Sequence, residues 1–105
     1  MLANTPKPPY YAVVFSATHT LNLEGYAEMA NRMVDLAHKQ DGFLGVESAQ
    51  GEVEITVSYW RDEKSILKWK ANLEHKAAQE KGKSDWYSAF KIRVAKVERA
   101  YSFDI

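Results

Sequence analysis

The chain has 105 residues, of which 46% are hydrophobic, so its size and composition fit one globular domain. The number of Lys and Arg residues equals the number of Asp and Glu residues, which leaves no net field to attract nucleic acid or an anionic membrane. The absence of cysteine excludes disulfides and cysteine-ligated metal sites. No apolar run approaches the length of a signal-peptide core or a membrane span, so we expect a cytoplasmic protein with no nucleic-acid or membrane partner.

The chain begins with an extended segment, a strand and a helix. Three prolines predict that residues 1–9 form an extended lead-in to a single domain over residues 10–105. Aromatic and β-branched residues predict a strand over residues 10–17, with apolar side chains on both of its faces. Asn22 is a typical N-cap and predicts a helix that ends near Lys39. Its expected buried stripe has helical spacing and consists of Tyr26, Met29, Met33 and Ala37.

A hairpin and a second helix follow. Gly42 predicts a left-handed exit from the first helix. Residues 43–49 and 53–60 predict two strands joined by a short turn. Asp62 is a typical N-cap for a second helix that ends before Gly82. The expected buried stripe of this helix consists of Ile66, Trp69, Leu73 and Ala77.

Residues 88–101 predict a final strand that is longer than its neighbours. Apolar residues alternate from Phe90 to Val94, but Val97 breaks the alternation, so we expect a β-bulge near Ala95–Lys96. The resulting order, β-α-β-β-α-β, predicts an α+β fold of the ferredoxin-like type. In this fold a four-stranded antiparallel sheet carries both helices on one face.

The sheet face without helices predicts a homodimer. This face carries either Tyr10, Ala12 and Val14 or the residues that alternate with them, and both sets are too apolar for water. Face-to-face pairing of two sheets covers them and gives a two-fold dimer. We expect Trp60 to pack at this dimer contact. The final strand is long enough to reach across the partner and cover a sheet edge.

Three segments of the chain resemble the antibiotic biosynthesis monooxygenase domain family, and most closely its small single-domain bacterial members. They are GYAEMANRMVDLAHKQDGFLG, YWRDEKSILKWKANLEHKAAQEKGK and WYSAFKIRVAKVERAY, and the similarity covers residues 10–101. The resemblance implies a dimeric α+β barrel. It also implies oxidation of a small aromatic, quinol or polyketide-like metabolite with O2, by a monooxygenase that needs no metal or flavin cofactor.

The resemblance leaves two other functions open. Related barrels bind small ligands without turnover or serve as stress-response modules. Haem-degrading relatives resemble this chain at Trp69, but they carry an asparagine in the first strand, where this chain reads AVVFSA. They also carry a histidine near the position of Gln79, so the haem-degrading function is the less favoured of the alternatives.

Cofactor-free oxygenation needs an apolar pocket, a base and hydrogen-bond donors for a substrate anion. Trp69 either closes the core or forms a pocket wall on which a flat ligand stacks. His75 faces water if the second helix is unbroken, but it becomes the best candidate base if Asn72 starts a fresh turn. The pocket is expected to be lined by Phe15, Tyr26, Met29, Met33, Tyr59, Asn72 and Leu73.

The remaining two histidines have weaker claims to a functional role. His38 ends the first helix, where an imidazolium suits the helix dipole. His19 follows the first strand in a polar stretch, THTLN, and would overhang the mouth of a pocket. The three histidines show no metal-ligand spacing, so we expect no metal site.

Overall fold

The computed structural model describes residues 1–79 and 86–104, and the side chains of residues 74–79 lie outside this description. The elements are, in chain order, β1 (Tyr10–His19), α1 (Tyr26–His38), β2 (Phe43–Ala49), β3 (Glu54–Trp60), α2 (Glu63–Gln79) and β4 (Tyr87–Val97). The strands form one antiparallel sheet in the order β2-β3-β1-β4. The predicted ferredoxin-like α+β fold is therefore confirmed.

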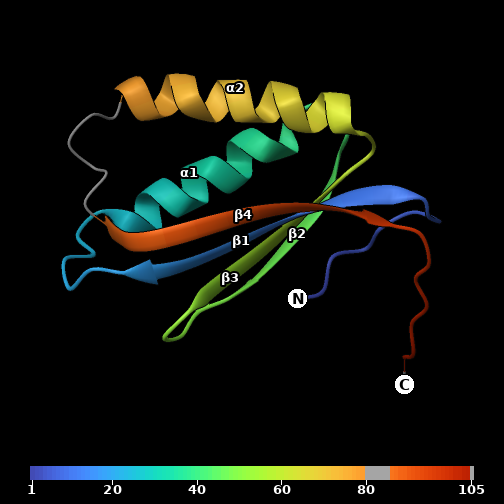
Figure 1. The fold of residues 1–105 in the computed structure, drawn as a ribbon, viewed down its shortest axis with the longest axis horizontal. Helices are drawn as coiled ribbons and strands as arrows, with labels where there is room; N and C mark the ends of the chain where they lie inside the picture. Colours follow the sequence, from blue (N-terminus) through green and yellow to red (C-terminus); the bar gives the residue numbers. More distant parts are fainter. Residues whose placement is uncertain (80–85, 105) are drawn as a thin grey trace.

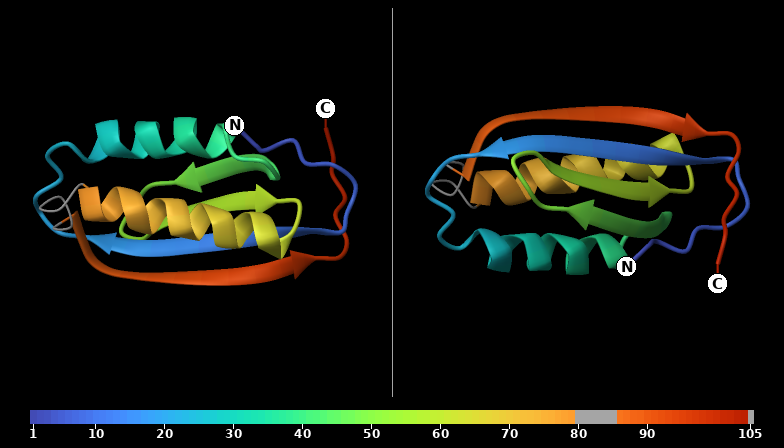
Figure 2. Two further views of the ribbon diagram at one scale, coloured as in Figure 1. Left: turned by 90° about the horizontal axis from the view of Figure 1, so that it is seen from above. Right: turned by 90° about the horizontal axis from the view of Figure 1, so that it is seen from below.

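The two helices lie on one side of the sheet, and both chain termini lie on the other (Figure 1). Seen along the normal to the sheet, α2 crosses over the central strands and α1 lies beside β2 (Figure 2). Strand β4 forms an edge of the sheet and lies outside the area that the helices cover. The helix layer therefore leaves the helix-facing side of β4 open.

The strand register shows which residues face the helices. Tyr11 lies opposite Trp60, and the Trp60 ring lies 5.6 Å from that of Trp69 on α2. Because side chains alternate along a strand, the odd-numbered residues of β1 from Tyr11 to Ala17 share the helix-facing side. Tyr10 and its even-numbered neighbours point to the bare side, so the register decides between the two sets that the sequence leaves open. Tyr10 and Ala12 are already buried within a single chain.

Trp60 anchors the core between sheet and helices. It is fully buried, and its ring lies 5.3 Å from that of Phe43 and 5.6 Å from that of Trp69. The prediction that Trp60 packs at a dimer contact is therefore wrong, because this residue lies on the helix-facing side of its strand. Ile66 of α2 is also buried here, so the first two residues of the predicted stripe, Ile66 and Trp69, face inward. The side chain of Ala77, the last residue of that stripe, lies outside the described residues.

The ends of the helices confirm two of the predicted signals and correct one. Gly42 has a φ of 88°, and the Asp62 carboxylate accepts the Ser65 backbone N–H over 2.8 Å, as a helix N-cap does. The predicted cap Asn22 is wrong, because its Oδ1 accepts the N–H of Glu24 and closes a turn before the helix. The helix begins at Tyr26, directly after Gly25. The predicted stop at Gly82 lies outside the described residues.

The described part of β4 differs from its prediction in length and regularity. The strand ends at Val97, and its pairing with β1 is continuous from Tyr10↔Val97 to Thr18↔Ala89. The bulge predicted near Ala95–Lys96 is therefore wrong. Val97 lies opposite Tyr10 on the bare side of the sheet, so the change in alternation reflects apolar residues on both faces.

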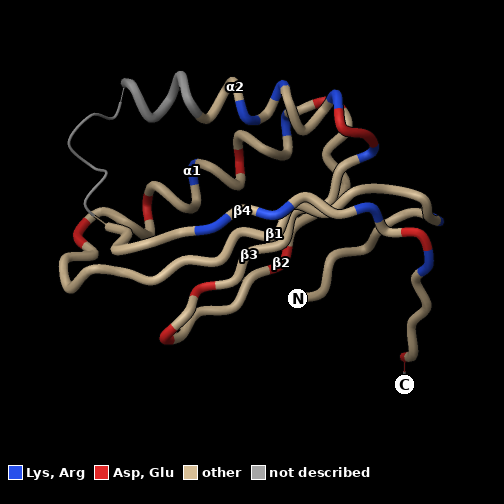
Figure 3. Tube along the Cα trace, in the orientation of Figure 1, with Lys and Arg blue, Asp and Glu red and all other residues tan. Residues whose placement is uncertain are grey.

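Residues 1–9 run along the bare side of the sheet (Figure 1). The Ala3 backbone N–H donates to Glu47 over 2.9 Å, and the Thr5 hydroxyl lies 2.9 Å from that of Tyr10. Basic residues recur along β4, and acidic residues gather at the β2–β3 hairpin (Figure 3). Among the described residues, no helix combines the length and the apolarity that a membrane crossing needs.

Candidate functional site

A buried carboxylate and a buried imidazole join the end of β1 to the start of β3. Glu54 lies opposite Ala17, on the helix-facing side of the sheet. His19 follows two residues later, and its Nε2 atom lies 2.9 Å from Glu54 Oε1. The side chains of His19 and Glu54 are only 12% and 4% exposed. Because buried polar groups cost free energy unless they are hydrogen-bonded, this contact fixes both side chains.

Hydroxyl groups complete the surroundings of the Glu54 carboxylate. Tyr26, the first residue of α1, donates to Oε1, and the Thr56 hydroxyl donates to Oε2 over 3.2 Å. Tyr87 of β4 donates in turn to the Tyr26 hydroxyl over 3.3 Å. These five residues, which we call the His19–Glu54 network, connect three strands and one helix.

A shift in the β1–β4 register brings Tyr87 into the network. Thr18 pairs with Ala89, but the next residue, His19, pairs with Tyr87, so Ser88 is an extra residue on β4. The Ser88 hydroxyl lies 2.7 Å from that of Thr18. An extra residue reverses the alternation of a strand, and Tyr87 consequently lies on the same side as His19.

Aromatic rings surround the network. The His19 ring lies 4.8 Å from the Tyr26 ring and 5.3 Å from the Tyr87 ring. Tyr87 also contacts Phe15 and Phe90, at ring distances of 5.4 and 6.0 Å. The imidazole therefore lies in an aromatic environment in which electrostatic interactions are stronger than in water.

The two tyrosines are held in their neutral forms. Burial raises the pKa of Tyr26, and the hydrogen bond to the Glu54 carboxylate raises it further. Burial also raises the pKa of Tyr87, although its hydrogen bond to Tyr26 acts in the opposite direction. Both hydroxyl groups are consequently protonated donors at neutral pH.

An open apolar strip on β4 leads to the network. Phe90, Ile92 and Val94 are 60%, 52% and 49% exposed. The register places all three on the helix-facing side of the sheet, at the edge that neither helix covers (Figure 2). Phe90 stacks on Phe15 at 5.8 Å and contacts Tyr87, so this β4 strip continues directly into the aromatic rings around His19.

The structure brings some predicted site residues together and separates others. Phe15 and Tyr26 contact Tyr87 and so lie at the His19–Glu54 network. Trp69 packs instead on Trp60, at the opposite end of β3 from Glu54. Tyr59 lies on the bare face of the sheet, where its hydroxyl donates to Glu47 over 2.6 Å.

The other predicted pocket residues lie on the helices. Met29 and Met33 of α1 and Asn72 and Leu73 of α2 are all half-buried. His75 belongs to α2, which is assigned as a single helix from Glu63 to Gln79. The side chain of His75 lies outside the described residues, so its role as a base stays a prediction.

Glu54 and Tyr87 are not among the site residues predicted from the sequence, and His19 is predicted only to overhang the mouth of a pocket. Glu54 shares its strand face with Trp60, and a core tryptophan on that face would have indicated that Glu54 is buried beneath the helices. No comparable signal identifies Tyr87, because a register shift sets its direction. In the described part of the chain, no three His, Cys, Asp or Glu residues gather as a metal site would require.

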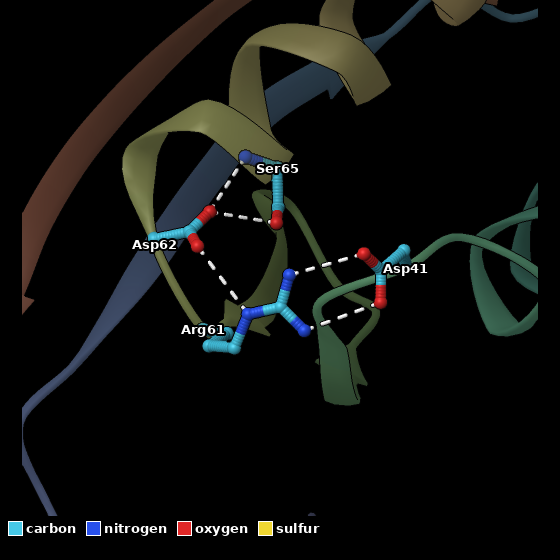
Figure 4. A network of polar contacts seen from close by, with 4 residues as sticks. All are labelled: Asp41, Arg61, Asp62 and Ser65. Atoms are coloured by element: carbon cyan, nitrogen blue, oxygen red, sulfur yellow. Dashed lines mark hydrogen bonds and ion pairs between the residues drawn. The ribbon is translucent and has the colours of Figure 1, made fainter.

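A second polar cluster lies at the other end of the sheet (Figure 4). The Arg61 guanidinium donates to both carboxylate oxygens of Asp41, over 3.2 and 3.1 Å, and to Asp62 over 3.3 Å. The Asp62 carboxylate also accepts the Ser65 hydroxyl over 2.7 Å. We call these four residues the Arg61 cluster. It joins the loop before β2 to the first turn of α2.

Known proteins resemble this chain in both sequence and fold. The sequence model of the family described as antibiotic biosynthesis monooxygenase matches residues 9–81. YqjZ of Bacillus subtilis, a protein of uncharacterised function, is 53% identical over 105 residues, which cover 97% of this chain and 91% of YqjZ. A jasmonate monooxygenase of Pyricularia oryzae is 40% identical over 43 residues, which cover 41% of this chain and 20% of that enzyme.

A solved structure shares the fold at low sequence identity. The crystal structure of PA3566 from Pseudomonas aeruginosa superimposes with a TM-score of 0.68 and 15% identity. The match covers 91% of this chain and 99% of PA3566. At this level of identity the comparison supports the arrangement of strands and helices, and the function must be argued from the site.

Proposed function

The chain belongs to the antibiotic biosynthesis monooxygenase family, and we propose that it oxidises a small electron-rich aromatic, quinol or polyketide-like metabolite with O2, without metal or flavin. The observation that carries this proposal is the continuity between the open β4 strip and the buried His19–Glu54 network. The strip offers apolar and aromatic surface to a flat ring. The network offers a base and hydrogen-bond donors beside it.

The proposed reaction requires little chemistry from the protein. A phenol or enol first loses a proton, and the resulting anion passes one electron to O2 to give a substrate radical and superoxide. The two combine into a peroxide anion, which takes back the proton, loses water and leaves a ketone or quinone. The protein contributes apolar surface for the substrate, a proton acceptor, and donors that stabilise developing negative charge.

Two residues predicted from the sequence have separate roles within this proposal. Trp69 packs on the fully buried Trp60, and this contact supports a core role that extends at most to a wall of the substrate site. His75 remains a predicted base on α2. Its replacement belongs in any activity test, alongside that of His19.

The experiment that tests the function is O2 uptake by metal-stripped protein with a panel of anthrones and hydroquinones. We expect uptake that depends on protein concentration and yields a product with one new oxygen atom, an anthraquinone from an anthrone or a hydroxyquinone from a hydroquinone. An anaerobic sample and a sample with chelator provide the controls. If no substrate gives uptake while ligands still quench tryptophan fluorescence, the oxygenase proposal fails and a ligand-binding module replaces it.

We also propose that two chains pair through their bare sheet faces in the cytoplasm, as a dimeric α+β barrel. Support comes from Ile55, which is 44% exposed on that face and lies opposite Ser16. Val14 and Val57 lie beside it in the register and extend the apolar surface. A solution mass equal to a single chain at micromolar concentration would contradict the dimer.

A further inference from the structure

We propose that His19 is the base that accepts the substrate proton and that Glu54 is the residue that positions its imidazole. This assignment rests on the proposed function and deepens it, because it names the atoms that perform the proton transfer. It also moves the base from α2, where the sequence suggests His75, to the end of β1.

The hydrogen-bond pattern determines which imidazole nitrogen is available. Nε2 of His19 lies 2.9 Å from Glu54 Oε1, and hydroxyl groups of Tyr26 and Thr56 donate to the same carboxylate. A carboxylate surrounded by donors acts as an acceptor, so the imidazole hydrogen lies on Nε2. In the neutral ring the lone pair therefore lies on Nδ1.

Nδ1 of His19 is buried and has no hydrogen-bond partner among the described residues. Buried polar atoms are normally paired, and an exception calls for an explanation. The other four members of the network satisfy one another, so the unpaired acceptor is not a sign of loose packing. A substrate hydroxyl that donates to Nδ1 would complete the network.

In this proposal the substrate approaches Nδ1 from the β4 strip. The Tyr87 ring contacts Phe15 and Phe90 of the aromatic surface and also the His19 ring. Its hydroxyl makes only a long hydrogen bond, 3.3 Å, to Tyr26. In this proposal a flat phenol on the strip takes the place of the Tyr87 ring beside the imidazole and presents its hydroxyl to Nδ1.

The proton transfer is balanced within the site. The substrate O–H bond breaks, the Nδ1–H bond forms, and the substrate keeps the electron pair as a phenolate. The resulting imidazolium donates its Nε2–H to Glu54, whose negative charge stabilises it. An orienting carboxylate plays the same part beside the histidine of a catalytic triad. Tyr26 and Thr56 hold the carboxylate in place.

The test uses 4-nitrophenol, because its phenolate absorbs visible light and its neutral form does not. The probe is titrated with wild-type protein at a pH at which the free phenol is neutral. We expect bound probe to appear as phenolate, in a saturable manner. The reaction needs no O2, so it separates the base assignment from the oxygenase function.

Three variants locate the base. His19→Gln should lower the bound phenolate fraction on the order of tenfold, since no proton acceptor remains at that position. His38→Gln is the matched control, because His38 is exposed at the end of α1 with its ring on Phe43, and it should leave the fraction unchanged. His75→Gln tests the alternative base on α2.

Glu54→Gln tests positioning through a pH profile. Among the residues that the structure describes, the titratable groups that face His19 are Glu54 of β3, Tyr26 of α1 and Tyr87 of β4, and this variant changes only the first. We expect the bound phenol to ionise at higher pH, because a neutral amide stabilises the imidazolium less. Binding of the neutral phenol should be preserved, which a merely structural loss would not allow.

Several outcomes would overturn the assignment. They are a wild-type protein that binds no phenolate, a folded His19→Gln variant with undiminished phenolate, or a loss that follows His75→Gln instead. If circular dichroism shows that His19→Gln does not fold, the pH profile of Glu54→Gln is used instead. A profile that does not shift from that of the wild type would contradict the assignment of His19 as the base. Phenolate formation without O2 uptake would refute the oxygenase function alone, and O2 uptake that survives in His19→Gln would refute the base alone.

Discussion

The two polar clusters of this protein lie at opposite ends of the sheet and differ in burial. In the Arg61 cluster the side chains of Arg61 and Asp41 are 54% and 83% exposed. In the His19–Glu54 network the corresponding values for His19 and Glu54 are 12% and 4%. Both join segments that are distant in sequence. Only the second places ionisable groups where water cannot solvate them.

The difference favours a role in the fold for the Arg61 cluster and agrees with the role in a reaction that we propose for the His19–Glu54 network. An exposed ion pair is screened by water and salt and contributes little, so its plainest role is to connect a loop to a helix start. A buried carboxylate and imidazole are costly to desolvate, and hydrophobic residues of similar volume often stabilise a core as well. Such a pair beside an open aromatic surface is a candidate functional site.

The directions of the pKa shifts repeat the contrast. At the exposed end, hydrogen bonds from Ser65 hold the pKa of Asp62 at about 2, and Arg61 lowers the pKa of Asp41. At the buried end, desolvation raises the pKa of Tyr26 and Tyr87. In the Arg61 cluster the pKa shifts come mainly from hydrogen-bond partners, and in the His19–Glu54 network they come mainly from burial.

Removal of Glu54 should have the largest effect on stability. Glu54→Ala leaves the buried hydroxyl of Tyr26 and Nε2 of His19 without their acceptor, at a cost of about 3 kcal/mol in the free energy of unfolding. Urea denaturation followed by tryptophan fluorescence measures it. Glu52→Ala, at an exposed position two residues earlier, is the control and should change little. Equal urea midpoints for the two variants would mean that the network does not stabilise the fold.

The sequence predicts the fold far better than the site, and the reasons are physical. Helix and strand periodicity reflects local geometry, and the alternation along β1 correctly separates its residues into two faces. Which of the two faces the helices cover is decided by the register of the folded sheet. Gly42 and Asp62 are local signals and are confirmed. Asn22 fails because an Asn side chain can close a turn as readily as it caps a helix.

The site depends on contacts that no local pattern encodes. His19 and Glu54 are 35 positions apart in the sequence, and Tyr26 and Tyr87 are 61 apart. Trp69 looks like a pocket residue in sequence because an inward helical stripe serves packing and binding alike, and the structure packs it on Trp60. The β4 strip is open because α2 lies over the central strands, and the periodicity of α2 does not determine that position.

Loss of the α2 cap should have an intermediate effect that disappears in acid. Asp62→Ala removes the acceptor for the Ser65 N–H and hydroxyl, and we expect the Tm to fall by about 5 °C at neutral pH. The folded-state pKa of about 2 lies below the ordinary value of 3.8, so the ionised form stabilises the fold. This contribution is complete above pH 3.8 and is lost as the pH falls through about 2.

Thermal melts of both proteins between neutral pH and pH 2 would measure this loss. The Tm difference between wild type and variant should shrink at the acid end. Asp62→Asn is an informative comparison, because an asparagine still accepts the Ser65 N–H but does not titrate. A Tm difference that stays constant into acid would show that the cap acts through something other than the carboxylate charge.

Replacement of Arg61 should have the smallest effect. Arg61→Ala removes the guanidinium contacts to Asp41 and Asp62 but keeps the backbone N–H of residue 61, which donates to the Gly42 carbonyl over 2.7 Å. The loop is therefore still tied to the end of β3. We expect the Tm to fall by about 2 °C or less at low ionic strength.

Salt dependence distinguishes this variant from the buried network. At about 1 M salt the Debye length is roughly 3 Å, so the exposed charges of the Arg61 cluster interact weakly even in the wild type, and the two Tm values should converge. The loss in Glu54→Ala should persist at the same salt concentration, because the partners of Glu54 are shielded from ions by the surrounding rings. A salt-independent loss in Arg61→Ala as large as that in Glu54→Ala would remove the distinction between the two clusters. The case for a reactive site at His19 would then rest on its unpaired Nδ1 alone.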